Sequence, residues 1–434
     1  MGKQRNRNTV RVHEDGKKLL IQALASKTNY KGKKWSQSDV VDASGISEGT
    51  VKRFFGGEVN VDRKSAEAIV SVLELNLDDL IDIQSSDTLS DESDEFDKQY
   101  IPDVSNFFGR TQELATIKQW ILQDKYRLIT LVGMEGIGKT SLAMKLKEQI
   151  NDKFDKVIVR SLENAPKLNQ LLTSLIIELS SKEITDTSNS IGINLARLEN
   201  ELNKNRYLLF LDNIEEILQP RETLGNYLQG YENYENFFIR VGITAPHQSC
   251  LVLLTQKKPQ VRKSLEYTLQ IKGLDHAAAK DIFKQHGFSD SEDLTKLIHL
   301  YQGHPLFLKL VLTTIRDDFG GSINNFLYQG STLDFGNIYA ILDNHFQNLS
   351  DLEKEIMCVL ASEDRSIPFS QLRTNIDICK KQFKQEGFTN AIKCLNSRGL
   401  IKNIEGEASY TLPSRVIINH IRRRLSNQNG LVEN

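Results

Sequence analysis

The residues with the clearest chemistry form one short stretch near the middle of the chain. Gly133–Thr140 reads GMEGIGKT and fits the P-loop pattern. Its glycines let backbone N–H groups curl around a polyphosphate, and the helix that follows directs its positive end at the anion. Lys139 supplies a positive charge for the terminal phosphates, and Thr140 offers a hydroxyl to Mg²⁺. The stretch therefore predicts a nucleotide phosphate site.

A carboxylate suited to the same site lies further along the chain. The apolar run Tyr207–Leu211 ends in Asp212, as a buried strand ending in an acid would. In P-loop ATPases such an Asp anchors the Mg²⁺ that the loop threonine binds. We therefore predict Thr140 and Asp212 as the Mg²⁺ ligands.

Hydrolysis would in addition need a group that orients water. Asn213 is a poor base, whereas Glu215 and Glu216 lie on the following turn. Either glutamate is equally interpretable as a surface charge, so both interpretations stay open. The candidate catalytic residues are Lys139, Asp212 and Glu215.

A parallel sheet is needed to position these groups, and the pattern after about residue 105 predicts one, because short apolar runs alternate with amphipathic helices. The predicted strands are Leu128–Val132, Val157–Val159, Leu208–Leu211, Leu251–Leu254 and Tyr267–Ile271. Apolar residues at helical spacing between Leu168 and Leu179 should pack on this sheet. From about Asp275 onward helical periodicity dominates. The last region, with a turn at Glu405-Gly406 between two short strands and a basic helix after them, suits a winged helix.

Composition excludes several classes of protein. The chain has 434 residues, of which 39% are hydrophobic and 26% are charged, with a formal net charge of −2. This excludes a wholly disordered chain and gives no global field for nucleic acid or membrane. No apolar run approaches the roughly 18 residues needed to cross a bilayer. The four cysteines lack the spacing of a metal site or a disulfide scaffold, so we predict a cytoplasmic protein with reduced thiols.

The first 83 residues predict a separate small domain. Gln37–Phe55 reads as a helix-turn-helix of the phage-repressor type, with Gly45 at the turn and Ser47 capping the second helix. The inward positions are Val40, Ile46, Val51 and Phe54. A third helix, Asp62–Leu75, completes a small core.

Two interpretations of this domain stay open. In one, Thr50 contacts base edges while Lys52, Arg53 and a basic arm, Lys3–Arg11 with Lys31, Lys33 and Lys34, contact phosphates. In the other, the fold is a protein-interaction module and the basic residues form a solvated face. Residues 36–83 carry four Lys/Arg against ten Asp/Glu, so only the arm is strongly basic. An acidic tether, in which residues 84–106 carry seven Asp/Glu against one Lys, follows the domain.

Further short motifs occur in a fixed order around the P-loop. They are Phe107-Phe108-Gly109-Arg110 before it, Cys250–Thr255 after Asp212, then Lys272-Gly273-Leu274-Asp275 and Gly303-His304-Pro305-Leu306. In this order the sequence resembles the STAND branch of AAA+ ATPases, specifically NB-ARC proteins, over roughly residues 105–425. It looks especially similar to cyanobacterial NB-ARC proteins with an N-terminal helix-turn-helix.

The resemblance implies a multidomain α/β plus α fold. It consists of a P-loop AAA+-like parallel sheet with flanking helices, a helical bundle and a winged helix, preceded by the small all-α helix-turn-helix domain. The predicted boundaries are 1–83 for the helix-turn-helix domain, 84–104 for the acidic linker, 105–272 for the nucleotide-binding domain, 273–335 for the helical domain, 336–425 for the winged helix and 426–434 for the tail. ATP or ADP with Mg²⁺ is the implied cofactor. The nucleotide-binding residues are Phe108, Gly109, Arg110, Gly133, Gly136, Ile137, Gly138, Lys139, Thr140, Ser141, Gln256 and Pro305.

Departures from the family pattern favour binding over turnover. Gln256 stands where the sensor strand usually ends in Arg, Asn213 stands in place of a second acid, and Leu412-Pro413-Ser414 replaces the usual Met-His-Asp. A neutral Gln lacks the guanidinium fork that reads a γ-phosphate. We therefore expect slow ATP hydrolysis at most, with ADP retained at rest.

Three functional hypotheses follow. In the first, nucleotide exchange opens a switch and drives self-oligomerisation, with residues 1–83 as a DNA-binding or interaction output. In the second, a DNA-binding regulator uses the ATPase core as a structural platform. The third is a defence or cell-death adaptor that acts through protein partners. The residues after the winged helix leave no room for a ligand sensor, so either the sensor is a separate protein or these residues are part of a longer one.

Overall fold

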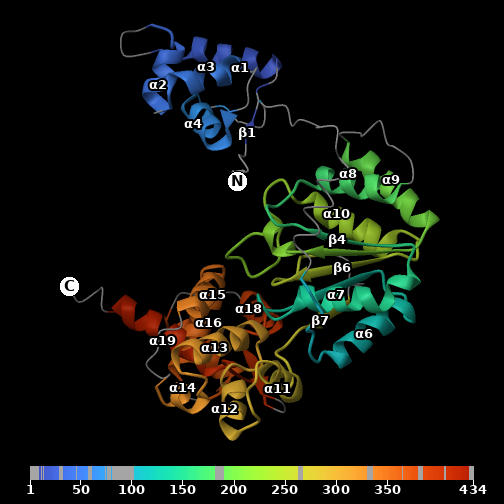
Figure 1. The fold of residues 1–434 in the computed structure, drawn as a ribbon, viewed down its shortest axis with the longest axis vertical. Helices are drawn as coiled ribbons and strands as arrows, with labels where there is room; N and C mark the ends of the chain where they lie inside the picture. Colours follow the sequence, from blue (N-terminus) through green and yellow to red (C-terminus); the bar gives the residue numbers. More distant parts are fainter. Residues whose placement is uncertain are drawn as a thin grey trace. The chain divides into compact units, whose positions relative to one another are not determined.

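The computed structural model describes residues 9–10, 12, 14–28, 33–44, 46–56, 61–73, 75, 80, 102–180, 190–261, 267–329, 336–363, 365–379, 385–404 and 407–429 (Figure 1). The chain divides into two compact units, Met1–Phe96 and Asp97–Asn434. Several predicted features lie outside the described residues, namely most of the basic arm, Lys31, the turn glycine Gly45, the linker before residue 102 and the turn Glu405-Gly406. The finer domain boundaries remain predictions.

The first unit is a small helical domain. Its helices are α1 (Glu14–Ser26), α2 (Gln37–Ser44), α3 (Glu48–Gly56) and α4 (Arg63–Leu73). Strands β1 (Thr9–Val10) and β2 (Val61–Asp62) pair antiparallel. Ser36 donates from its backbone N and its Oγ to Asp39 Oδ2, at 2.7 Å each, which fixes the start of α2.

The core of this unit uses the positions expected for a helix-turn-helix. Val40, Val51 and Phe54 are buried together, while Ile46 is half-buried against them. The side chains of α2 and α3 thereby pack on α4 and on α1, which supplies Leu20. The helix-turn-helix arrangement predicted from the apolar spacing is confirmed.

The second unit begins with a five-stranded parallel sheet in the order β4-β5-β6-β3-β7. The strands are β3 (Leu128–Val132), β4 (Lys156–Ser161), β5 (Tyr207–Asp212), β6 (Cys250–Thr255) and β7 (Tyr267–Gln270). All five predicted strands are therefore present; β3 has the predicted bounds, and the ends of the other four differ from the prediction by at most two residues. The P-loop follows β3. This strand lies between β6 and β7, so the P-loop begins in the interior of the sheet and not at its edge.

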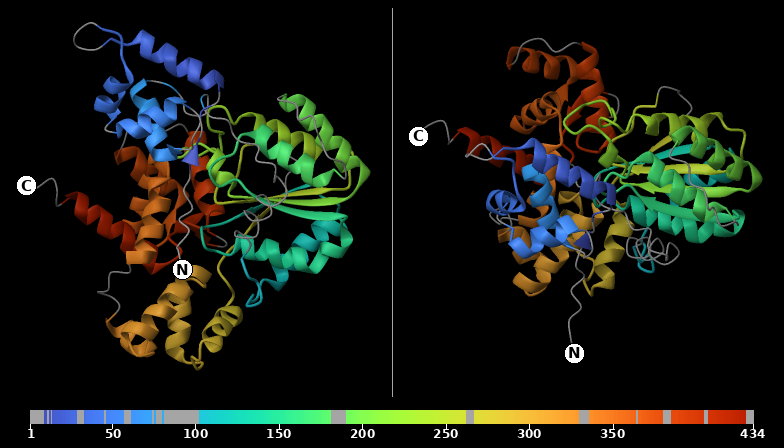
Figure 2. Two further views of the ribbon diagram at one scale, coloured as in Figure 1. Left: turned by 45° about the horizontal axis from the view of Figure 1, so that its top comes forward. Right: turned by 90° about the horizontal axis from the view of Figure 1, so that it is seen from above.

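Helices cover both faces of this sheet (Figure 1, Figure 2). On one face lie α8 (Leu168–Leu179), α9 (Ile191–Lys204) and α10 (Asn233–Ile239), and on the other lie α6 (Thr111–Leu122) and α7 (Lys139–Ile150). Successive residues of β5 alternate between the two cores, with Phe210 in one and Leu211 in the other. Because both faces are buried, the strands read as continuous apolar runs.

Helices dominate the rest of the chain, as the periodicity predicts. They are α11 (His276–Gln285), α12 (Glu292–Leu300), α13 (Pro305–Asp318), α14 (Ile323–Gln329), α15 (Gly336–Gln347), α16 (Asp351–Ser362), α17 (Phe369–Cys379), α18 (Gln385–Ser397) and α19 (Arg415–Asn429). A small antiparallel sheet in the order β8-β10-β9 is formed by β8 (Ile367–Pro368), β9 (Lys402–Ile404) and β10 (Ser409–Thr411). The sequence did not reveal β8.

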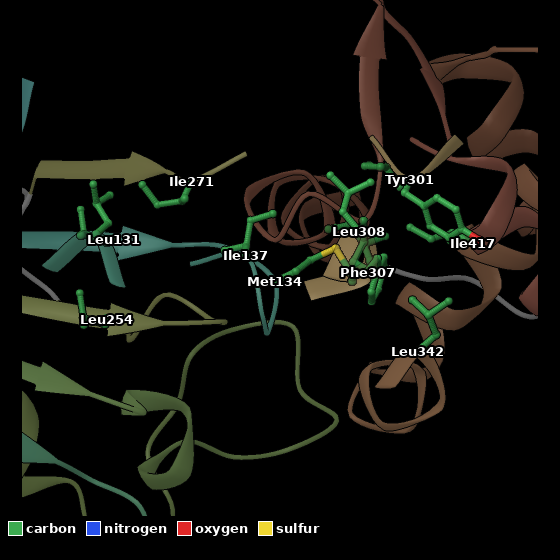
Figure 3. Close-up of a cluster of buried hydrophobic side chains, with 14 of the residues drawn as sticks. Leu131, Met134, Ile137, Leu254, Ile271, Tyr301, Phe307, Leu308, Leu342 and Ile417 are labelled. Carbon is green, nitrogen blue, oxygen red and sulfur yellow. The ribbon is translucent and has the colours of Figure 1, made fainter. Parts of the chain in front are cut away.

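One of these two hydrophobic cores joins a face of the sheet to the helical segments that follow it. Leu131 of the sheet, Phe307 of α13 and Ile417 of α19 belong to the same buried cluster (Figure 3). The sheet, the helical segment and the winged-helix segment are therefore packed together. Within the described part of the chain, no helix has the length and apolar character needed to cross a membrane.

Candidate functional site

The P-loop holds its glycines in conformations that favour glycine. Gly136 has φ of +73° and Gly138 has φ of +97°, in the left-handed region where a side chain is strained. Lys139 begins α7 and is only 8% exposed. Its Nζ donates to the carbonyl oxygens of Gly133 at 2.9 Å and Met134 at 3.0 Å. The ammonium group thus lies inside the curve of the loop.

Burial makes the charge of Lys139 costly. Burial lowers the pKa of Lys139, while the carboxylates of Glu215, Asp212 and Glu135 act in the opposite direction. An anion bound in the loop would favour the charged form further. The group is therefore arranged to gain from a phosphate ligand.

The predicted Mg²⁺ ligands lie together. Thr140 donates from Oγ1 to Oδ2 of Asp212 at 2.5 Å, and Asp212 is buried at the end of β5. The backbone N of Asn213 donates to Oδ1 of Asp212 at 2.8 Å. Asn213 has φ of +57°, and its Nδ2 donates to Ser161 Oγ at the end of β4. The carboxylate is thus fixed by its own strand turn and aimed at the loop hydroxyl.

The two glutamates after Asp212 have different surroundings. Glu215 accepts a hydrogen bond from the backbone N of Gln256 at 3.1 Å, which ties it to the end of β6. Burial, with the charges of Glu215 and Glu163, raises the pKa of Glu216. Glu215 lines the cavity in front of the P-loop, and Glu216 does not.

A cavity of about 400 Å³ collects most of the predicted residues. Those brought together are Gly136, Gly138, Lys139, Thr140, Ser141, Asp212, Glu215, Gln256 and Pro305. Pro102, Glu135, Asn213, Leu306 and Lys309 complete its lining. Pro102, Leu306 and Lys309 were missed in the sequence. A signal existed for the last two, because Leu306 follows Pro305 directly and Lys309 is one helical turn further on.

The predicted residues Phe108, Gly109, Arg110, Gly133 and Ile137 do not line this cavity. Arg110 is buried, and it donates from Nη1 to Glu113 Oε1 at 2.8 Å and from Nη2 to the carbonyl oxygen of Ile137 at 2.9 Å. Gly109 approaches α11 so closely that a Cβ there would lie 2.5 Å from Ala278 Cβ. This segment therefore connects the start of α6 to the P-loop and to α11.

The first turn of α13 forms the wall opposite the P-loop. Pro305 is the first residue of the helix, and His304 caps it by accepting from the backbone N of Phe307 at 3.4 Å. A Cβ on Gly136 would lie 2.4 Å from Leu306 Cδ2 and 2.6 Å from Leu306 Cβ. The helix therefore rests directly on the loop, and only a glycine fits beneath it.

Lys257 follows Gln256, the residue that stands where the family usually has an arginine. The side chain of Lys257 points away from this cavity. Its Nζ donates to the carbonyl oxygens of Gln219 at 2.9 Å and of Glu222. Burial, together with the charge of Arg398, lowers the pKa of Lys257 to about 8. Lys257 thus does not replace a sensor arginine in this conformation. Pro413 and Ser414, in the segment that departs from Met-His-Asp, also lie outside the lining.

In the first unit, the predicted DNA-contacting residues lie on α3. Lys52 forms an ion pair with Glu48 at 2.7 Å, with 64% and 69% of the two side chains exposed. Arg53 donates to Thr50 Oγ1 at 3.2 Å and to the Gly49 carbonyl oxygen at 3.1 Å. The three residues share an accessible surface.

Comparison with known families identifies both parts of the chain. The NB-ARC domain family matches residues 110–293, and the family of Cro/C1-type HTH DNA-binding domains matches residues 31–86. The chain contains an NB-ARC nucleotide-binding domain and an N-terminal helix-turn-helix domain. Its AAA+-like fold, with a parallel sheet and flanking helices, agrees with this assignment.

The relatives of this chain include longer proteins. It is 34% identical over 418 residues to an uncharacterized WD repeat-containing protein of Nostoc, a match that covers 89% of this chain and 33% of the relative. It is 26% identical over 332 residues to the disease resistance-like protein DSC1 of Arabidopsis thaliana, with 72% and 24% covered. The chain thus spans between a quarter and a third of these relatives.

Among solved structures, it is similar to a signal transduction ATPase with numerous domains (STAND) protein from Pyrococcus horikoshii that has a tetratricopeptide repeat sensor. The identity is 20%, the TM-score is 0.40, and the match covers 74% of this chain and 43% of the other.

The donor set of the P-loop cavity fits a nucleotide with Mg²⁺. Gly138 has open space where a Cβ would stand, Lys139 supplies a buried cation, and Thr140 and Asp212 offer two oxygens. Oxygen donors are what Mg²⁺ prefers, and it usually keeps several waters beside such protein ligands.

Proposed function

We propose that this protein is a nucleotide-controlled switch in which ADP or ATP, with Mg²⁺, binds at the P-loop cavity. Lys139 and the loop backbone would bind the phosphates, Thr140 and Asp212 would hold Mg²⁺, and Pro305 would contact the base. The observation that carries the proposal is the wall of the cavity. Because α13 rests on Gly136 while most of the remaining lining comes from the P-loop, the start of α7 and the ends of β5 and β6, a nucleotide there contacts two parts of the fold at once.

This arrangement supports control by exchange. The core that joins the sheet to α13 and α19 is continuous, which is the closed form expected with ADP. An additional γ-phosphate would need space where Leu306 lies against the loop, and it would thereby favour separation of α13. Separation would expose apolar surface that a second copy of the chain could cover. We infer self-oligomerisation in the ATP-bound form.

Hydrolysis in this proposal is slow. Glu215 is the residue placed to orient water, since it lines the cavity and its carboxylate is held by the Gln256 backbone. Gln256 is neutral and gives little stabilisation to charge on a transferred phosphoryl group. The switch would therefore stay in one state long enough to signal.

Purified wild type and Lys139→Ala test the proposal. We expect wild type to release an adenine nucleotide on denaturation, and to increase in mass by light scattering when a non-hydrolysable ATP analogue replaces ADP. Lys139→Ala should do neither. Lys145→Ala is the matched control, because Lys145 lies on the same helix and pairs with Glu148 outside the cavity. A wild type without nucleotide, and a Lys139→Ala variant that assembles like wild type, would refute the switch.

A second function is favoured by the first unit. We propose that α3 binds DNA, because its exposed Lys52 and Arg53 belong to a domain of the Cro/C1 type. Gel shifts at two salt concentrations, with and without ATP, test how the two functions are related. Binding that changes with ATP indicates an output of the switch, whereas salt-sensitive binding independent of nucleotide indicates a DNA-binding regulator with a structural NB-ARC core.

A further inference from the structure

A second cavity, of about 1110 Å³, borders the P-loop and shares no lining residue with the nucleotide cavity. Residues of the loop face one cavity or the other, with Met134 and Ile137 lining the second. The first turn of α13 divides in the same way, since His304 and Phe307 line the second cavity and Leu306 lines the first. The loop and α13 therefore form the wall between the two cavities.

Part of this second cavity is apolar. Met134, Ile137, Phe307, Ile401 and Ile417 line it, and all five are buried in the core. Figure 3 shows Met134 and Ile137 reaching from the loop toward Phe307, with Ile417 beyond. An apolar group of a ligand would find complementary surface here.

Another part of the lining carries polar groups that lack partners. Arg398 follows α18 and is 7% exposed, yet its Nε has no hydrogen-bond partner among the described residues. The hydroxyl of Tyr301, in a residue only 2% exposed, also lacks a partner within the described part of the chain. Buried polar groups, and a guanidinium above all, destabilise a fold unless something pairs with them.

The protein itself compensates Arg398 incompletely. Glu353 is the buried carboxylate in the same region, but no ion pair joins it to Arg398 among the described residues. Its Oε2 accepts hydrogen bonds from the backbone N and the Oγ of Ser350, at 2.8 Å each, and its Oε1 has no hydrogen-bond partner in the described part of the chain. At the exposed rim, Lys272 and Lys402 outnumber Glu407. The cavity therefore has an excess of positive charge at one part and apolar surface at another.

We propose that this second cavity binds a small organic oxyanion, a carboxylate or a phosphate with an apolar body, anchored by the guanidinium of Arg398. The planar guanidinium fork matches both oxyanions with paired hydrogen bonds. Tyr301 donates from its hydroxyl, and Lys272 and Lys402 attract the anion at the rim. The apolar body lies against Met134, Ile137 and Phe307. Because those side chains come from the P-loop and α13, a ligand bound in the second cavity contacts the wall that also borders the nucleotide cavity.

Thermal unfolding with simple probes tests this proposal separately from the switch. Phenyl phosphate and benzoate carry the two oxyanions on one ring, and phenol is the neutral control. To exclude binding at the P-loop, the measurement uses wild type saturated with ADP and, independently, the Lys139→Ala variant. We expect phenyl phosphate or benzoate to raise the unfolding temperature by about 2–4 °C at roughly ten times its Kd. The anion that acts identifies the ligand as a phosphate or a carboxylate.

Arg398→Gln decides whether the anchor is correct. We expect it to weaken the probe's affinity at least about tenfold, while the unliganded variant unfolds at or above the wild-type temperature because a buried unpaired charge is gone. Arg365→Gln, an exposed arginine of the winged-helix segment outside the cavity, should change neither value. The proposal is overturned if neither anion acts, if phenol acts equally well, or if the stabilisation survives Arg398→Gln.

Discussion

Helix α3 of the first unit and the P-loop of the second both carry cations, but they hold those cations differently. On α3, Lys52 and its partner Glu48 are mostly exposed, so water screens the pair and either side chain moves freely. In the P-loop, Lys139 is buried and held by two carbonyl oxygens. The difference shows that the P-loop lysine is held in place by the fold, whereas the α3 cations are not; any ligand of α3 would therefore have to order them.

The strongest test of a preorganised site is to neutralise its buried carboxylate. Asp212→Asn keeps an oxygen for the Thr140 hydroxyl but loses the charge that favours Mg²⁺. We expect the affinity for ATP with Mg²⁺ to fall about 30- to 100-fold, or ~2–3 kcal/mol, by isothermal titration calorimetry. Without Mg²⁺ the two proteins should agree within about threefold. An equal loss in both conditions would mean that Asp212 acts only on the fold.

We expect a smaller effect, on the pH dependence of the free energy of unfolding, from the buried cation Lys257. Its pKa of about 8 in the folded protein lies below the ordinary value of 10.5, so the unfolded chain binds more protons between those values. This term makes stability rise as the pH rises through that window. We expect the gain in the free energy of unfolding from pH 7 to pH 9.5 to be about 1–2 kcal/mol smaller in Lys257→Met.

Urea unfolding at pH 7 and pH 9.5 measures this contribution of Lys257 to the free energy of unfolding. Lys258→Met is the control, because Lys258 is a neighbouring lysine with an exposed side chain that bonds Thr268 Oγ1. A Lys257→Met protein with the same pH dependence as wild type would show that the lysine is not desolvated.

On the exposed surface the expected effects are smaller and depend on salt. Lys52→Gln and Arg53→Gln should each reduce the slope of log affinity for DNA against log salt by about 1, because each removes one phosphate contact. Fluorescence anisotropy across a salt series measures the slope. Lys284→Gln, an exposed lysine of α11, is the control. Unchanged slopes in both α3 variants would favour the protein-interaction interpretation of this domain.

The smallest expected effect is an increase in the affinity for DNA. Glu48→Gln releases Lys52 from its ion pair and removes a negative charge from the α3 surface. We expect DNA affinity to rise by about two- to fivefold at low salt, with little change at high salt where the pair is screened. A loss of affinity would indicate that the pair positions Lys52 for contact.

Elements whose formation depends on residues close together in the chain, and motifs with a known pattern, could be predicted from the sequence. The run Leu128–Val132 became β3 with those bounds, because a strand buried on both faces is apolar throughout. Thr140 and Asp212 were paired across a long separation by the pattern of P-loop ATPases, and the parallel sheet brings them together because its strands end at one edge. The helix-turn-helix core followed from apolar spacing alone.

Features that depend on packing between distant segments were not visible in the sequence. Nothing around Arg398 predicts a buried guanidinium, since the cavity that it lines is closed by the P-loop and by α13. Arg110 resembles a nucleotide contact by motif, yet the structure shows its guanidinium bonded to the Ile137 carbonyl oxygen. The two-residue strand β8 is too short to give a periodic pattern, and it forms because β10 lies beside it.

The close approach of Leu306 to Gly136 has a consequence for evolution. A methyl group at residue 136 would overlap the Leu306 side chain, so a change at one position is tolerated only when the other changes in size as well. Substitutions at residues 136 and 306, which lie far apart in the chain, are therefore coupled. Among related sequences, we expect a small residue at the first position to accompany a large one at the second.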